Sequence, residues 1–199
     1  MIWGAPLPAA SSSPGECGSA GSWLRPQDQV WLVSTRHLSS IRCGGEVAVA
    51  RYDRLGWIRA DTAAFYAADD AEVLTCVYAH AARVEAHLVP TRALTVYRSL
   101  LSGAAEAPAL RLVIWSWPAE RATLRHRLDF QLKAHRSDVQ GCYLAQFIGR
   151  MDAGTPVMLI GYSYGARTVA AAAHVLSGGT AAGWRMPEED ALRERAGIR

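Results

Sequence analysis

The sequence predicts an α/β fold in which a mostly parallel sheet is flanked by helices. From residue 30 onward, short apolar or β-branched runs alternate with longer amphipathic segments, as strands and helices do in α/β proteins. The chain has 199 residues, 50% of them apolar and 20% charged, which is the composition of an ordinary globular domain. A chain of this length builds a core without disulfides or metal. We therefore expect one domain over residues 30–199.

Residues 1–29 are predicted to form a disordered tail. They are rich in Pro, Ser, Gly and Ala, and they lack the cationic start and sustained apolar core of a secretory signal. Charged residues also interrupt every apolar stretch before it reaches the roughly 18 residues of a membrane helix. The sequence thus predicts a cytoplasmic protein without a membrane span.

The first half of the domain is predicted to contain four strands. Residues 30–36 form the first strand, and residues 46–53 and 56–60 could pair as an antiparallel hairpin across a short turn. Residues 73–79 form a nearly continuous apolar run, typical of a strand buried on both faces. This strand delivers His80 to the loop at its carboxyl end.

Helices and strands then alternate. Residues 90–103 have helical apolar spacing between an entry proline and a final glycine. Residues 110–117 form a buried strand that Pro118 ends. Three leucines at a spacing of four mark the next helical segment, at Leu124, Leu128 and Leu132.

Residues 137–140 are typical of a capping box, which would open a further helix. The inward face of this helix would comprise Val139, Tyr143, Phe147 and Met151. A third buried strand at 157–160 and a small-residue helix at 166–176 complete the pattern. We expect the strands at 73–79, 110–117 and 157–160 to be adjacent and parallel, because helix-length crossovers separate them.

Composition argues against several classes of site. The cysteines, Cys17, Cys43, Cys76 and Cys142, lie far apart without a C-x-x-C pair, so we expect lone thiols and no metal site. The net charge of +3 comes from scattered arginines, which does not suggest nucleic-acid binding. Neither glycine-rich nucleotide-binding motif follows a strand, and we expect no cofactor.

The candidate catalytic motif is the pentapeptide at residues 161–165, which fits G-x-S-x-G. It follows one predicted strand directly and opens directly into a helix, as a nucleophile elbow requires. Gly161 and Gly165 would let strand and helix approach closely around a strained Ser163. The backbone N–H of Tyr164 would then point at a developing oxyanion. The alternative is a plain strand-to-helix turn in which the serine caps the helix.

With these motifs, the sequence resembles the α/β-hydrolase superfamily over residues 30–179. The family's strand that ends in His-Gly corresponds to residues 77–80, and its next strand to residues 114–118. The resemblance implies that Ser163 is a nucleophile and that the backbone N–H of Ala81 is a second oxyanion donor. Alanine follows His80 where the family usually has glycine. The family's base lies after the nucleophile in the chain, so His80 is interpreted as a loop anchor.

The acid and histidine that the family places after its serine have no clear counterpart here. His174 would lie some 15 Å along the helix from Ser163, given a rise of about 1.5 Å per residue. Asp190 lies in an acidic-then-basic segment typical of a short solvated helix. We therefore interpret residues 30–199 as an α/β-hydrolase-like domain, truncated before the later strands.

The sequence leads to two functional hypotheses. The first is a serine hydrolase that acts on an ester or related acyl bond of a small substrate through Ser163, and that is nearly inactive in this form. The second is a non-catalytic module of the same fold that binds an acyl ligand or a partner chain. An unpaired strand edge beside Ser163 would in either case favour self-association.

Overall fold

The computed structural model describes residues 24–53, 55–102 and 107–187. Its centre is a six-stranded open sheet in the order β3-β2-β1-β5-β4-β6. The strands are β1 (Gln29–Ser34), β2 (Ala48–Tyr52), β3 (Trp57–Ala60), β4 (Leu74–Ala79), β5 (Leu110–Ser116) and β6 (Val157–Gly161). β1, β5, β4 and β6 are parallel, whereas β2 and β3 are antiparallel to their neighbours. The predicted α/β class is confirmed.

Two specific expectations about the sheet are also confirmed. β4, β5 and β6 are parallel, and β4 lies between the other two. β2 and β3 form an antiparallel hairpin, with Tyr52 opposite Trp57. Asp53 closes the turn because its carboxylate accepts the backbone N–H groups of Leu55 and Gly56.

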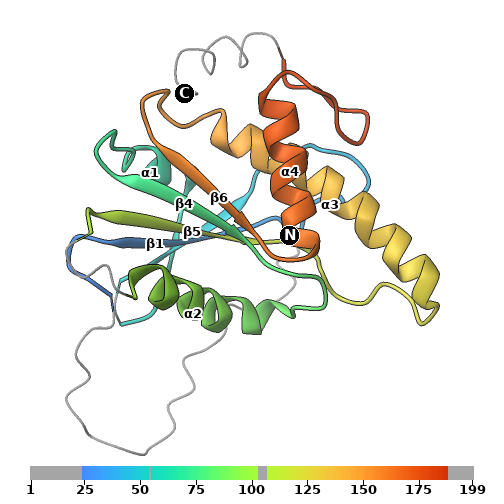
Figure 1. The fold of residues 1–199 in the computed structure, drawn as a ribbon, viewed down its shortest axis with the longest axis horizontal. Helices are drawn as coiled ribbons and strands as arrows, with labels where there is room; N and C mark the ends of the chain where they lie inside the picture. Colours follow the sequence, from blue (N-terminus) through green and yellow to red (C-terminus); the bar gives the residue numbers. More distant parts are fainter. Residues whose placement is uncertain (1–23, 54, 103–106, 188–199) are drawn as a thin grey trace, which may run out of the picture.

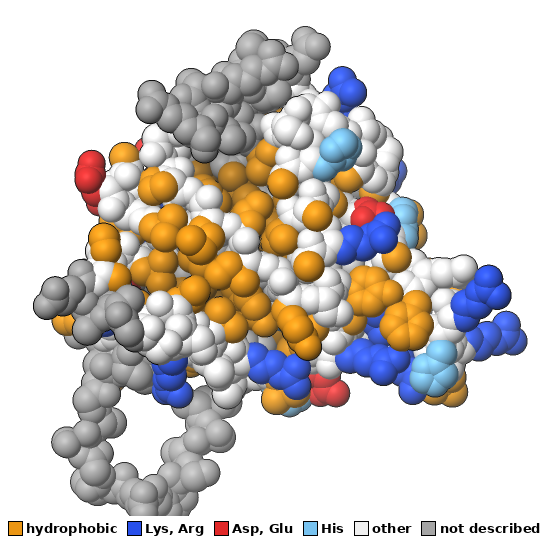
Figure 2. Space-filling model, in the orientation of Figure 1, with side chains coloured by type: hydrophobic (Ala, Val, Ile, Leu, Met, Phe, Trp, Pro, Cys, Tyr) orange, Lys and Arg blue, Asp and Glu red, His pale blue; other side chains and the backbone are white. Residues whose placement is uncertain are grey.

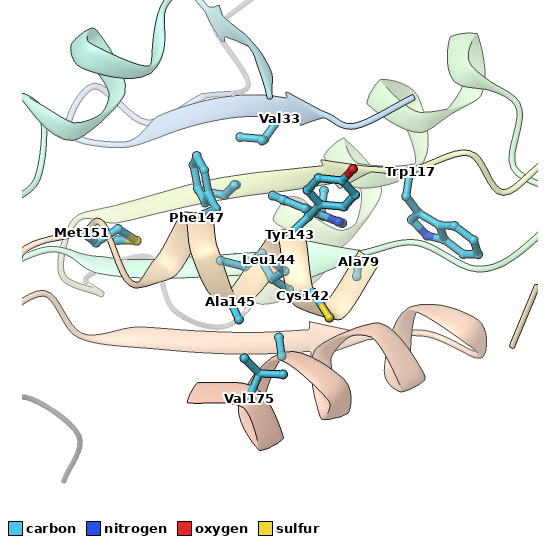
Figure 3. Packing of buried hydrophobic residues seen from close by; sticks show 14 of the residues in the cluster. Val33, Ala79, Trp117, Cys142, Tyr143, Leu144, Ala145, Phe147, Met151 and Val175 are labelled. Carbon is cyan, nitrogen blue, oxygen red and sulfur yellow. The ribbon is translucent and has the colours of Figure 1, made fainter. Parts of the chain in front are cut away.

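Helices cover both faces of the sheet (Figure 1). α2 (Val89–Leu101) packs on one face with the short 3-10 turn η1 (Ala86–Leu88), and α1 (Thr62–Tyr66), α3 (His126–Ile148) and α4 (Tyr164–Leu176) pack on the other. In Figure 3, Tyr143, Leu144 and Phe147 of α3 lie over the strands. α3 and α4 approach so closely at Gly141 that an added Cβ there would lie 2.4 Å from the Ala171 Cβ.

One predicted helix boundary is wrong. α3 is a single helix of 23 residues, whereas the sequence predicted a new helix at residues 137–140. Ser137 does not cap anything, because its hydroxyl donates to the carbonyl of Lys133 one turn earlier. No glycine or proline interrupts the segment between His126 and Gln140. The predicted inward face is confirmed for Val139, Tyr143 and Phe147, which are buried, whereas Met151 is buried beyond the end of the helix at Ile148.

The fold begins earlier than the tail assigned to residues 1–29. Leu24 is buried, and the buried carboxylate of Asp28 accepts hydrogen bonds from the Tyr97 hydroxyl and the Leu110 backbone N–H. Arg25 forms an ion pair with the same carboxylate. These contacts join residues 24–28 to α2 and β5, while residues 1–23 lie outside the described part.

Candidate functional site

The turn between β6 and α4 holds Ser163 in a backbone conformation that non-glycine residues rarely adopt. Ser163 adopts φ 56° and ψ −118°, a conformation that costs a non-glycine residue on the order of 1–3 kcal/mol. Hydrogen bonds hold it from both sides: Tyr162 N–H donates to Ala79 O at 3.1 Å, and Ala166 N–H to Ser163 O at 2.9 Å. Strain of this kind is found where a fold fixes one side chain in place.

The two glycines of the motif are required by close backbone contacts. A Cβ at Gly161 would lie 2.4 Å from the Ala166 Cα, and a Cβ at Gly165 would lie 2.0 Å from the Ala79 carbonyl oxygen. Strand β6, helix α4 and the end of β4 therefore meet at backbone distance. This is the steric reason for the glycine spacing that the sequence indicated.

Ser163 faces solvent at the carboxyl edge of the sheet, and its side chain does not cap α4. The structure thus contradicts the alternative in which the serine serves as a helix cap. Within the described residues, the Ser163 hydroxyl forms no hydrogen bond, and the Tyr164 N–H at the start of α4 donates to no carbonyl. An unpaired N–H at a helix start is a site of positive potential.

The loop after β4 reaches the same edge. A Cβ at Gly165 would also lie 2.7 Å from the carbonyl oxygen of His80, so the elbow rests against this loop. The Ala81 N–H, the second donor implied by the resemblance, makes no hydrogen bond within the described chain. Ala81 is partly exposed. The structure therefore brings Ser163, Tyr164 and the His80 loop to one edge.

His80 lies buried beneath this loop. One ring nitrogen, Nδ1, lies 2.8 Å from the Ala81 carbonyl oxygen, and the other, Nε2, lies 3.3 Å from the Trp117 backbone N–H. Trp117 in turn donates its indole N–H to the His80 carbonyl at 2.9 Å. Burial lowers the pKa of His80 to about 4. The ring is thus neutral at pH 7, with Nδ1 as the donor, and it holds the loop in place.

Arg36, which the sequence analysis did not single out, connects the loops at this edge. It follows β1 and donates to Ser116 Oγ at 2.8 Å and to the Val84 carbonyl at 3.0 Å. Its guanidinium also lies 3.3 Å from His80 Nε2 and pairs with Glu120. Burial lowers the pKa of Arg36 to about 10. The sequence analysis placed Arg36 at the end of the strand predicted over residues 30–36, whereas β1 ends at Ser34.

A buried ion pair lies on α3. The side chain of Lys133, the only lysine in the chain, pairs with Asp129, and both are fully buried. The hydrogen bond from Lys133 lowers the pKa of Asp129 to about 2. The same carboxylate accepts the Ala122 backbone N–H at 2.8 Å. This pair fixes the loop between β5 and α3, and sequence periodicity gave no sign of it.

No histidine is placed to act on Ser163. The six histidines of the chain all lie in the described part, and none forms a hydrogen bond with this serine. His174 is exposed in the last turn of α4. Asp190 lies outside the described residues. In the described part, no cluster of three or more His, Cys, Asp or Glu side chains could hold a metal ion.

A hollow of about 410 Å³ opens beside the His80 loop. Charged side chains dominate its lining, which comprises Arg83, Glu85, Ala86, His87, Glu120 and Arg121. Small-molecule pockets are usually lined by apolar and aromatic groups around a few polar ones. The hollow is therefore unsuited to an apolar acyl chain.

Searches against models of known protein families, against curated proteins and against solved structures return no match. None of the helices in the described ranges is both long enough and apolar enough to cross a bilayer.

Proposed function

We propose that this chain carries the nucleophile of a serine hydrolase of the α/β-hydrolase type, which acts on an ester or related acyl bond of a small substrate. The observation that supports this most strongly is the elbow itself. Ser163 is held at φ 56° with an exposed side chain, between two glycines that have no room for a Cβ. A turn without chemistry does not need this strain.

In the proposed reaction, Ser163 Oγ bonds to the acyl carbon while its proton passes to a base. The alcohol leaves with a proton as the C–O bond breaks, and water then releases the acid from the acyl-enzyme. The N–H groups of Tyr164 and Ala81 are the candidate donors to the oxyanion, because neither has a partner in the described chain. His80 and Arg36 would position the Ala81 loop.

The described residues do not supply the base that this proposal needs. None of the chain's six histidines bonds to Ser163, and a serine hydroxyl without a base is a weak nucleophile. The loss of a triad member lowers rates by orders of magnitude and leaves the contributions of the oxyanion hole and of binding. We therefore expect this chain alone to react slowly.

Fluorophosphonate labelling tests the proposal. We expect slow modification at Ser163 that Ser163→Ala abolishes and that Ser102→Ala, at another exposed serine, leaves unchanged. The rate should show no titration at about pH 6 to 7, where an imidazole would titrate. Fast labelling with such a titration would show that a histidine of this chain does reach Ser163. Labelling without preference for Ser163 would refute the role of this serine as the nucleophile.

The alternative is a non-catalytic module of the same fold that binds an acyl ligand or a partner chain. In the part of the chain that the structure describes, no histidine bonds to Ser163, and this favours the alternative. An activated acyl donor distinguishes the two functions, because only the hydrolase would transfer the acyl group to Ser163.

We also propose that the chain self-associates through β6. This strand pairs only with β4 among the described strands, and Met158 on it is 44% exposed. β6 carries no charge or proline, the residues that usually protect an edge strand. Figure 2 shows a broad hydrophobic area on this face. A strictly monomeric chain in sedimentation velocity would contradict this proposal.

A further inference from the structure

The first half of α3 and the loop before it expose large apolar side chains. Leu124 is 80% exposed, Leu128 42%, Phe130 49% and Leu132 37%. Leu128 and Leu132 lie one turn apart on the same side of the helix. Phe130, two residues from each of these leucines, lies on another side of the helix and stacks on Tyr164. The four exposed residues are named the apolar rim. Exposed side chains of this size are ordinary when they are scattered, but a group of them marks an interaction surface.

Cationic side chains surround the apolar rim. Arg121, Arg125 and Arg127 are exposed, and Arg136 is partly exposed. The only acid between residues 121 and 137 is Asp129, which is fully buried and paired with Lys133. The surface of residues 121–137 is thus apolar and positive, and the partly exposed Glu120 next to it pairs with Arg36. Figure 2 shows hydrophobic and blue side chains next to one another over this end of α3.

This segment lies at the carboxyl edge of the sheet. α3 runs antiparallel to the strands, so its first half projects beyond the start of α4 (Figure 1). The rim adjoins the elbow, because the rings of Phe130 and Tyr164 stack at 6.4 Å and the Tyr164 hydroxyl donates to the Phe130 carbonyl. Tyr162, beside Ser163, is 68% exposed. Phe130 of the rim therefore contacts the residue that directly follows the candidate nucleophile.

We propose that the apolar rim and its arginines bind the surface of an anionic lipid bilayer. The leucines would enter the boundary between headgroups and acyl chains, while the guanidinium groups bind lipid phosphates. An arginine can extend its charged end to the headgroups while its stem stays in the apolar layer. The mode is peripheral, because none of the helices in the described ranges could cross a bilayer.

The mixture of side chains favours a bilayer over other anionic partners. A nucleic acid would use the arginines, but its phosphate backbone offers nothing to exposed leucines. A bilayer has phosphates and hydrocarbon at adjacent depths, and it satisfies both kinds of side chain at once. Bound in this way, the protein would hold Ser163 close to the lipid surface. The binding itself does not depend on Ser163 being reactive.

Vesicle co-sedimentation of the full chain tests the inference. We expect binding to phosphatidylcholine vesicles that contain phosphatidylglycerol, and much weaker binding to phosphatidylcholine alone. Arg125→Gln with Arg127→Gln should weaken binding about 25-fold, at about fivefold for each arginine near an anionic surface. Leu128→Ser with Leu132→Ser should also weaken it at least tenfold. Because Leu128 and Leu132 are 42% and 37% exposed, urea unfolding of each double variant checks that the fold is retained before binding is compared.

The matched control is Leu55→Ser with Arg150→Gln, which changes one exposed leucine and one exposed arginine at the opposite edge of the sheet. It should bind as the unmodified chain does. Three outcomes would overturn the inference: no binding to anionic vesicles, equal loss in the control, or full binding by the leucine variant. The last would identify a polyanion site of the kind that binds nucleic acid. None of these outcomes depends on whether Ser163 reacts.

Discussion

Replacing Gly165 by alanine should destabilise the chain because the added methyl group meets main-chain atoms on β4 and its exit. The new Cβ would lie 2.0 Å from the Ala79 carbonyl oxygen, 2.6 Å from the Ala79 carbonyl carbon and 2.7 Å from the His80 carbonyl oxygen. Overpacking costs about 1–3 kcal/mol where side chains can shift. Here the neighbours are backbone, so we expect about 3 kcal/mol or more, out of a typical total of about 5–15 kcal/mol.

Urea unfolding followed by tryptophan fluorescence measures this loss, since Trp31, Trp115 and Trp117 are all buried. With a slope of about 1–3 kcal/mol per molar urea, the midpoint should fall by about 1 M or more. Gly154→Ala is the control, because its Cβ would lie 3.6 Å from the Ala71 Cβ, an ordinary contact. We expect that variant to be neutral or slightly stabilised. Equal midpoints for the two variants would refute the close approach at the elbow.

Three further predictions concern the same edge and its neighbouring strand. Burial lowers the pKa of His80 to about 4, so between about pH 6.5 and 4 the unfolded chain binds a proton that the folded chain does not. The free energy of unfolding should therefore fall by up to about 3 kcal/mol as the pH drops through this range. A free energy of unfolding that does not change with pH, or a pH dependence that His80→Gln leaves unchanged, would contradict this prediction. Arg36→Met should raise the His80 pKa, because the Arg36 charge lowers it. The same variant should lower the free energy of unfolding by about 1–3 kcal/mol, because it leaves the Val84 carbonyl and Glu120 without their partner. An unchanged His80 titration by NMR would count against this role of Arg36. Met158→Lys adds a charge to the β6 edge and should lower self-association in sedimentation velocity, whereas unchanged association would place the contact elsewhere.

Local sequence patterns predicted most of the fold. Continuous apolar runs with helix-length connections between them identified β4, β5 and β6 as neighbours, because such a pattern fits few topologies. The pattern around Ser137 failed because a capping box and a mid-helix serine look alike in sequence. The hydroxyl of Ser137 is satisfied inside α3 by the Lys133 carbonyl, and only packing decides between the two.

The candidate site was predictable only in part. The glycine spacing around Ser163 reflects a local steric need, so it can be read from one segment of the chain. The contacts of Arg36 join loops that follow three different strands. The buried pair of Asp129 and Lys133 resembles an ordinary surface pair at helical spacing. Contacts of this kind depend on the folded arrangement, and a single sequence carries no pattern for them.

The most direct test of the central claim is acyl transfer from an activated ester in the presence of added imidazole, with the modified residue mapped by peptide mass spectrometry. If Ser163 is a nucleophile that lacks its base, imidazole should supply that base and raise acylation at this residue by about tenfold or more. Ser163→Ala should abolish the modification, and Ser102→Ala should not. Acylation that is spread over exposed serines, or that shows no response to imidazole at Ser163, would contradict the account.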